Sequence, residues 1–475
     1  QTLSNTKDSE LSIWLNMLGF DSRFALYNFL QAPLVKDQSM SRQLLRSWTG
    51  RKLLDQISDL ITLDEDETGT KVFNTFESIL ESQEAVSTLD LIKALPGEVI
   101  HFDLNQWVQV VSSWRSELRK QQQLITDLSE LSFETDINDE PEVLNDELKE
   151  SIHEFVLLEV EHRNESLNLE VWSPLDRRKP RESWIIFLPG LGGDQSHFRW
   201  LARSLSHQGW SVVILDHPGS NHKALNSLME GTLPAPGGAE VFPYRLSDLH
   251  AVVKAKEEGL INIPGEKIVL MGHSLGSLTS FFASGAIPKK GLIERCENAL
   301  NDLSITNLSR FLQCQLVDVP LPDQGEIKDL NAIVGINSFG SLLWPDESSL
   351  KIDIPVLLTG GTFDLITPAL NEQLVMMVSL DSNKYNRALL IEGASHFSPI
   401  RVKGQTDQSK RKDLFQLSDA LVGSHPLSVQ SLLANKIIKF LDYIESGKEV
   451  NVVTNQIGSG LRFHILDKEI SRDLI

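Results

Sequence analysis

The chain has little of what identifies several large classes of protein. Only 2 of its 475 residues are cysteine, too few for a zinc site built from cysteines or for a framework of several disulfides. Its longest apolar runs span about five residues, as in 184–188, whereas a membrane-spanning helix needs roughly 18. The sequence therefore predicts no transmembrane segment.

Basic residues are also few. Lys and Arg total 44 against 65 Asp and Glu, which gives a net charge of −21. A protein that binds nucleic acid presents a basic face to the phosphate backbone, so this excess of acid argues against nucleic acid as a partner.

What is present indicates a folded protein of more than one domain. Hydrophobic residues make up 41% of the chain and charged residues 23%, enough to build sizeable cores. At about 150 residues per domain, the length indicates two or three domains. The chain begins with Gln1 rather than Met, which suggests processing or truncation, so a signal peptide would not be visible.

Residues 1–130 are predicted to form an all-helical domain, because apolar residues such as Val72, Phe76 and Leu80 recur at helical spacing. Large aromatic side chains in this part need burial, so we expect the domain to dock against the rest of the chain. The alternative is an independent module on a tether. Residues 131–150 are the expected acidic linker, since 127–150 hold ten acidic residues and one lysine.

The pattern changes after residue 150. Residues 155–161 and 167–172 flank a polar turn, as in an antiparallel hairpin. Short apolar runs then alternate with helical patterns, which is typical of a parallel sheet buried on both faces. These runs are 184–188, 211–215, 267–271, 332–336, 355–359 and 387–391. The sequence thus predicts an α/β domain over 151–446 with an eight-stranded, mostly parallel sheet, and a tail of undetermined structure at 447–475.

The strongest local signal is Gly272-His273-Ser274-Leu275-Gly276. It follows an apolar strand and precedes a helical stretch, the context that a G-x-S-x-G nucleophile elbow requires. Side chains at the flanking positions would clash in so sharp a turn, hence the two glycines. Ser274 is therefore the expected nucleophile, with its Oγ exposed, and His273 is expected to be structural.

A serine hydroxyl is a weak nucleophile and needs a base oriented by a carboxylate. In this architecture the acid and the histidine follow the serine along the chain, each just past the carboxyl end of a strand. Asp364 follows the run 355–359, and His396 follows the run 387–391. Asp353 is a weaker alternative for the acid because it precedes its strand.

The developing oxyanion needs fixed N–H donors. One is expected to be the backbone N–H of Leu275, directly after the nucleophile. The other is expected in the glycine-rich turn after the first parallel strand, and Leu191 is the best assignment. A dinucleotide-binding turn is a poorer interpretation, because the glycines at 190, 192 and 193 do not fit G-x-G-x-x-G.

These motifs resemble the α/β-hydrolase fold over about residues 150–446. More narrowly, 190–192, 216–221, 272–276 and 393–397 resemble a cyanobacterial group that is similar to platelet-activating-factor acetylhydrolases and dienelactone hydrolases. That group carries a helical N-terminal domain of unknown function, which residues 44–96 resemble. Pro189 departs from the pattern, since relatives often have His there. The resemblance implies hydrolysis of carboxylic esters, and a serine nucleophile in place of the cysteine of dienelactone hydrolases favours ordinary esters.

The sequence therefore predicts a serine esterase or lipase that requires no cofactor and no metal. Long loops at 219–244, 287–330 and 401–425 suggest a covered site for a bulky or lipid-like ester, with 287–330 as a lid-like insertion; solvent-exposed decoration is the alternative. Acyl transfer or peptide cleavage by the same triad stays open. So does a non-catalytic binding or scaffold protein.

Both cysteines, Cys296 and Cys314, lie in the insertion, 18 residues apart. We expect a disulfide between them, with two free thiols as the alternative. A disulfide indicates an oxidising compartment, so the periplasm or the exterior is slightly favoured over the cytoplasm.

Overall fold

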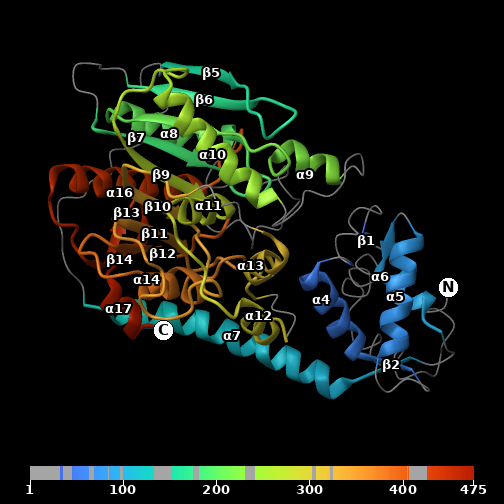
Figure 1. Ribbon diagram of the computed structural model, residues 1–475. Coiled ribbons are helices and arrows are strands. Elements are labelled where there is room, and N and C mark those ends of the chain that lie inside the picture. The colour runs from blue at the N-terminus through green and yellow to red at the C-terminus, as the bar shows by residue number, and fades with distance from the viewer. Residues whose placement is uncertain are drawn as a thin grey trace. The chain divides into compact units, whose positions relative to one another are not determined.

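The computed structural model describes most of the chain (Figure 1). The described residues are 33–35, 45, 47–63, 69–83, 85–96, 100–132, 152–174, 181–229, 241–301, 306–320, 325–403, 405 and 425–475. They fall into two compact units, one within residues 1–108 and 227–235, the other within 109–226 and 236–475. The expected acidic linker at 131–150 lies outside the described residues, apart from its first two.

The first unit combines helices with two very short sheets. Its helices are α4 (Trp48–Asp59), α5 (Thr70–Ser82) and α6 (Thr88–Ala94). Antiparallel pairs are formed by β1 (Pro33–Val35) with β3 (Val86–Ser87), and by β2 (Ile61–Leu63) with β4 (Ile100–Phe102). The prediction of an all-helical domain is wrong in this respect, because strands of two or three residues are too short to leave a period of two in the sequence.

Helix α7 (Leu104–Glu130) carries the chain from the first unit into the second, which begins within this helix. Leu124 and Leu128 on its second half are buried in the core of the second unit. Asn455 Nδ2 donates a hydrogen bond to the Ser129 carbonyl at 3.1 Å. The domain boundary expected at residue 130 thus differs from the division of the structure, which assigns the second half of α7 to the sheet unit.

Within the described residues, the second unit is built on a ten-stranded sheet in the order β13-β14-β12-β11-β10-β9-β7-β8-β6-β5. The strands are β5 (Ile152–Leu158), β6 (Leu167–Ser173), β7 (Ser183–Leu188), β8 (Ser211–Leu215), β9 (Lys267–His273), β10 (Leu330–Ile336), β11 (Val356–Gly361), β12 (Arg387–Ile391), β13 (Val453–Gly458) and β14 (Leu461–Leu466). Strands β8, β7, β9, β10, β11 and β12 run parallel, as the six apolar runs predict. Antiparallel hairpins extend the sheet at both edges.

The prediction of eight strands is wrong by one hairpin. Residues 447–475 form β13, β14 and the short helix α17 (Lys468–Asp473) rather than a tail. The centre of β13 is the polar run Thr454-Asn455-Gln456, so this strand lacks the apolar character by which the other strands were found. It is recognisable only because it pairs with β14.

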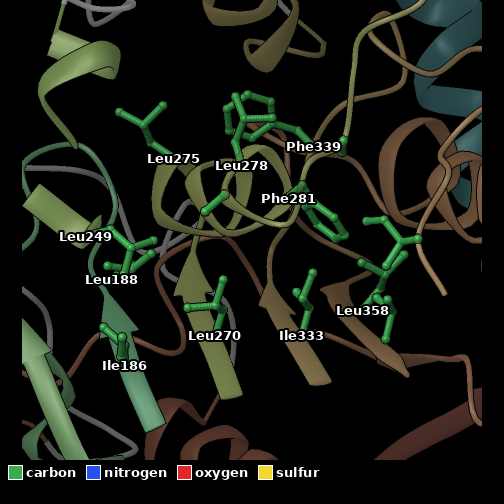
Figure 2. Packing of buried hydrophobic residues seen from close by; sticks show 14 of the residues in the cluster. Ile186, Leu188, Leu249, Leu270, Leu275, Leu278, Phe281, Ile333, Phe339 and Leu358 are labelled. Carbon is green, nitrogen blue, oxygen red and sulfur yellow. The ribbon is translucent and has the colours of Figure 1, made fainter. Parts of the chain in front are cut away.

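Helices cover both faces of the sheet, so alternate strand residues enter two separate cores. One core holds Ile186, Leu270, Ile333 and Leu358, and the other holds their chain neighbours on the opposite face. Figure 2 shows these four side chains directed toward the helix that carries Leu278 and Phe281. Burial on both faces explains why the central strands are continuous apolar runs.

The helices between β7 and β13 belong to the second unit, apart from the last three residues of α9, which belong to the first. They are η2 (Gln195–Phe198), α8 (Arg199–His207), α9 (His222–Met229), α10 (Phe242–Glu257), α11 (Leu275–Ala283), α12 (Leu292–Ala299), α13 (Ser309–Gln315), η4 (Leu316–Asp318), η5 (Leu370–Leu374), α14 (Val375–Ser379) and α16 (Pro426–Ser446). The expected insertion at 287–330 contains α12 and α13, and the Cys296–Cys314 disulfide joins these two helices.

Removing the disulfide is expected to destabilise the second unit. Closing a loop of 18 residues restricts the unfolded chain, and replacing both cysteines with serine should lower the free energy of unfolding by about 3 kcal/mol. Urea denaturation measures the loss. Thiol counting on the denatured, unreduced protein should find no free thiol, and two free thiols would contradict the bond.

Truncations made just before and just after α7 test where the sheet unit begins. A chain that begins at residue 104 keeps Leu124 and Leu128, and one that begins at residue 133 loses both. Because a buried leucine contributes about 2–5 kcal/mol, only the second truncation should lower the stability of the sheet unit sharply in urea. Equal stability of the two chains would contradict this division. Docking of the N-terminal domain remains a prediction, and insolubility of the first truncation would support it.

Candidate active site

Ser274 lies at the carboxyl edge of the sheet, between β9 and α11. Its backbone has φ 52° and ψ −118°, a conformation unfavourable for a residue with a Cβ. Hydrogen bonds hold the turn: Ser274 N donates to the Ile336 carbonyl at 2.8 Å, and Leu278 N donates to the Ser274 carbonyl at 3.1 Å. This is the strand–turn–helix arrangement in which a G-x-S-x-G serine is presented.

The two glycines of the pentapeptide are required by close backbone contacts. A Cβ on Gly272 would lie 2.3 Å from the backbone of Gly276, and a Cβ on Gly276 would lie 1.8 Å from the Leu188 carbonyl oxygen. Neither position therefore tolerates a side chain unless the elbow or the end of β7 moves.

Asp364 and His396 are brought together by the loops that follow β11 and β12. His396 Nδ1 lies 2.9 Å from Asp364 Oδ2. The same oxygen accepts hydrogen bonds from Thr367 Oγ1 at 2.6 Å and from Asn337 Nδ2 at 2.7 Å. The other carboxylate oxygen accepts the backbone N–H groups of Ile366 and Thr367, each at 2.8 Å.

These contacts keep Asp364 ionised. Burial alone would raise the pKa of this carboxyl, but the electrostatic attraction of the His396 imidazole and the hydrogen bonds from His396 and Thr367 outweigh burial, so its pKa lies below the ordinary value. An ionised Asp364 is an acceptor only, so His396 Nδ1 carries the proton between them. Nε2 is then the basic nitrogen of the imidazole.

Asp353, the alternative acid, is exposed and lies before β11, at the opposite edge of the sheet. The described contacts therefore favour Asp364. Ser274 itself is only 6% exposed, which differs from the expected exposed hydroxyl. The turn after β7 lies directly against it, since a Cβ on Gly190 would be 3.1 Å from Ser274 Cβ.

His273 joins the elbow to the loop of His396. Its Nε2 lies 3.0 Å from the His396 carbonyl oxygen, and the two rings are 4.9 Å apart between centroids. Burial lowers the pKa of His273 to about 3, so the ring is neutral and Nε2–H is the donor. A structural role was expected for this residue, and its contact is with the backbone of His396.

The two expected oxyanion donors lie in the elbow and in the turn after β7. Among the described residues, no acceptor is hydrogen-bonded to the backbone N–H of Leu191 or of Leu275. The N–H of Gly192, by contrast, donates to the Ser220 carbonyl at 2.7 Å. Both N–H groups are thus available to a ligand, as oxyanion donors must be.

The sequence did not predict a role for Thr367 or Asn337, although both contact Asp364. Asn337 directly follows β10 and has φ 50°, so its place just past a strand end was a usable signal. Thr367 lies three residues after Asp364, and its hydroxyl contact depends on the fold of that loop.

Asp216, which follows β8, is a further carboxyl that is partly buried. Its Oδ2 accepts a hydrogen bond from Asn221 Nδ2 at 3.1 Å, and its Oδ1 is buried with no partner among the described residues. Burial raises the pKa of Asp216 to about 6 despite that hydrogen bond, with a further contribution from the charge of Asp194.

This shift predicts a pH-dependent gain in stability from Asp216→Asn. Below about pH 3 the carboxyl is neutral in both the folded and the unfolded protein, so the substitution should change little. Above pH 6 the folded protein holds a poorly solvated charge, and Asn removes it, with an expected gain of about 1 kcal/mol. Thermal unfolding at about pH 3 and about pH 7.5 measures the difference, and an equal effect at both would contradict the prediction.

Comparisons with known proteins agree with this architecture. Residues 183–290, which contain the turn after β7 and the elbow, match a family model described as alpha/beta hydrolase fold. Residues 3–103 match a second model, described as an alpha/beta hydrolase of unknown function (DUF1400). A search of curated proteins found no significant match. Among the described residues, no helix has the length and apolar character needed to span a membrane. The matched residues and the topology of the sheet together show that this chain contains an α/β-hydrolase domain.

Proposed function

We propose that the protein is a serine hydrolase that cleaves carboxylic esters through an acyl-enzyme. Ser274 is the nucleophile, His396 the general base and acid, and Asp364 the group that orients His396. The backbone N–H groups of Leu191 and Leu275 bind the oxyanion. The observation that carries the proposal is the Asp364–His396 hydrogen bond of 2.9 Å, on a loop that His273 links to the elbow of Ser274.

In the first half-reaction, His396 Nε2 takes the proton of Ser274 as Oγ bonds to the carbonyl carbon of the ester. The electron pair of the C=O bond moves to oxygen, where the two N–H donors stabilise the charge. Collapse of this intermediate breaks the bond to the alcohol, which leaves with the proton from His396. Water then attacks the acyl-enzyme by the same steps, releases the acid and restores Ser274. None of these steps needs a metal or a cofactor.

Apolar side chains support an ester with an apolar part. They lie on and beside the acid loop, which follows β11 and carries Asp364. Phe363 and Leu365 flank Asp364 and are 50% and 37% exposed. The insertion reaches this loop, since Ser309 N donates to the Ile366 carbonyl at 2.8 Å, and Leu308 next to it is 40% exposed. We infer that these three side chains contact the apolar part of the ester. The resemblance to platelet-activating-factor acetylhydrolases agrees with a lipid-like substrate.

The insertion is anchored where it meets this loop. The buried carboxylate of Glu372 accepts hydrogen bonds from Asn307 Nδ2 at 2.8 Å, Ser309 Oγ at 2.9 Å and Gln313 Nε2 at 3.1 Å. The start of α13 is thus fixed beside the acid loop and supports a preformed wall of the site.

Two other functions would use the same fold. An acyltransferase or a peptidase would form the same acyl-enzyme and differ only in the acceptor or in the scissile bond. A binding or scaffold protein would form no acyl-enzyme at all. The described contacts of Asp364 and His396 favour an active enzyme over a scaffold.

Replacing Ser274 with Ala should abolish labelling by a fluorophosphonate probe and lower ester turnover by about 10⁴–10⁶-fold, because the nucleophile is lost. Asp364→Asn should retain more activity than His396→Ala. Unfolding in urea checks that each variant is folded. Labelling of the Ala variant at wild-type rate would contradict the assignment, and a wild-type protein that does not label would favour a scaffold.

Phe363→Ser should change the preference for acyl chain length. Losing part of an apolar contact removes about 1 kcal/mol of binding, so the ratio of kcat/KM for p-nitrophenyl octanoate over acetate should fall about 5–10-fold. Ile457→Ser is the matched control, an exposed apolar residue on β13 at the far edge of the sheet, and it should leave the ratio unchanged. An unchanged ratio in Phe363→Ser would contradict the apolar contact.

A further inference from the structure

Arg245 on α10 is a buried cation that none of the steps above uses. Only 1% of the residue is exposed. Its Nη2 donates to the Pro189 carbonyl, its Nη1 donates to Ser220 Oγ at 2.8 Å, and its Nε donates to Thr279 Oγ1 at 3.2 Å. One guanidinium therefore joins the turn after β7, the loop after β8 and the elbow helix α11.

These contacts fix Leu191 from both sides. On the preceding side, Arg245 holds the carbonyl of Pro189. On the following side, Gly192 N donates to the carbonyl of Ser220, the residue whose hydroxyl accepts from Arg245. The backbone N–H of Leu191 lies between these two anchored peptides, so its direction depends on both of them.

The charge of Arg245 is expensive to bury, which indicates that the contacts have a use. Burial lowers the pKa of Arg245 to about 9, and the nearby carboxylate of Asp248 opposes that shift. Asp248 itself is bonded to other partners, Arg163 at 2.6 Å and His217 at 2.8 Å. An apolar side chain would fill the same space without this penalty but would leave the Pro189 carbonyl unpaired.

We propose that Arg245 is a positioning residue of the oxyanion site, which holds the turn of Pro189–Gly192 so that Leu191 N–H points at the reacting carbonyl. The inference rests on the proposed function. Lys in place of Arg supplies a single point of charge and cannot hold three acceptors in one plane. The turn should then move while the nucleophile, the base and the acid stay in place.

The test compares Arg245→Lys with the wild-type protein. Misplacing one oxyanion donor lowers turnover without weakening ground-state binding, so kcat should fall about 10–100-fold while KM stays within about threefold. The rate of fluorophosphonate labelling should fall in parallel. Hydrogen exchange of peptides that cover 189–193 should become faster.

Arg387→Lys is the matched control. Arg387 is also buried and donates to backbone carbonyls, those of Lys384, Asn386 and Val450, but it opens β12 at the opposite edge of the sheet. It should leave kcat and the exchange of 189–193 unchanged. If Arg245→Lys does not fold, Ser220→Ala removes one acceptor of Arg245 and should lower kcat several-fold with the same KM.

Folded variants with wild-type kcat and wild-type exchange at 189–193 would overturn the proposal, as would an equal loss in Arg387→Lys. A wild-type protein that neither labels nor hydrolyses esters would refute the proposed function instead. Exchange at 189–193 would then still decide whether Arg245 holds the turn.

Discussion

The close approach of the elbow to the end of β7 is the contact on which the rest of the site depends. The backbone of Gly276 lies so near the Leu188 carbonyl that a single added carbon would sit 1.8 Å from it. In the same turn Ser274 has φ 52°, and the turn at Gly190 lies against the serine. Ser274, the proposed nucleophile, and the turn that carries its expected oxyanion donor thus share one steric constraint.

Two buried carboxylates, those of Asp364 and Glu372, accept most of the polar contacts around this turn that are described above. Asp364 collects donors from three loops and keeps the proton of His396 on Nδ1. Glu372 collects donors from the insertion and from the loop after β10, including Gly340 N at 2.9 Å. Both carboxylates are buried and hold several hydrogen bonds. They therefore tie the loop of Asp364 to the loop after β10 and to the insertion.

Local patterns identified the parts of the molecule that depend on local constraints. The elbow could be predicted because two glycines must flank a strained serine. Asp364 and His396 could be proposed because residues that follow the carboxyl ends of parallel strands lie at one edge of the sheet. The hydrogen bond between Arg245 and Pro189 joins residues 56 positions apart, and no local sequence pattern predicts it. Strand β13 could not be predicted either, because it is polar at its centre. Sequence analysis assigns helix α7 to the helical domain because a helix buried against a distant core has the same apolar periodicity as a helix buried within a bundle.

The hydrogen bond between Asn455 and Ser129 joins residues 326 positions apart. It connects the helix at the start of the sheet unit with the hairpin near its C-terminal end. Contacts of such high sequence separation form late, since the entropy of closing the loop is lost before the contact contributes. During synthesis the second half of α7 emerges from the ribosome long before its partners in the C-terminal hairpin. Leu124 and Leu128 are therefore synthesised before many of their native neighbours in the sheet unit, and apolar surface that stays exposed in this way favours aggregation of a nascent chain.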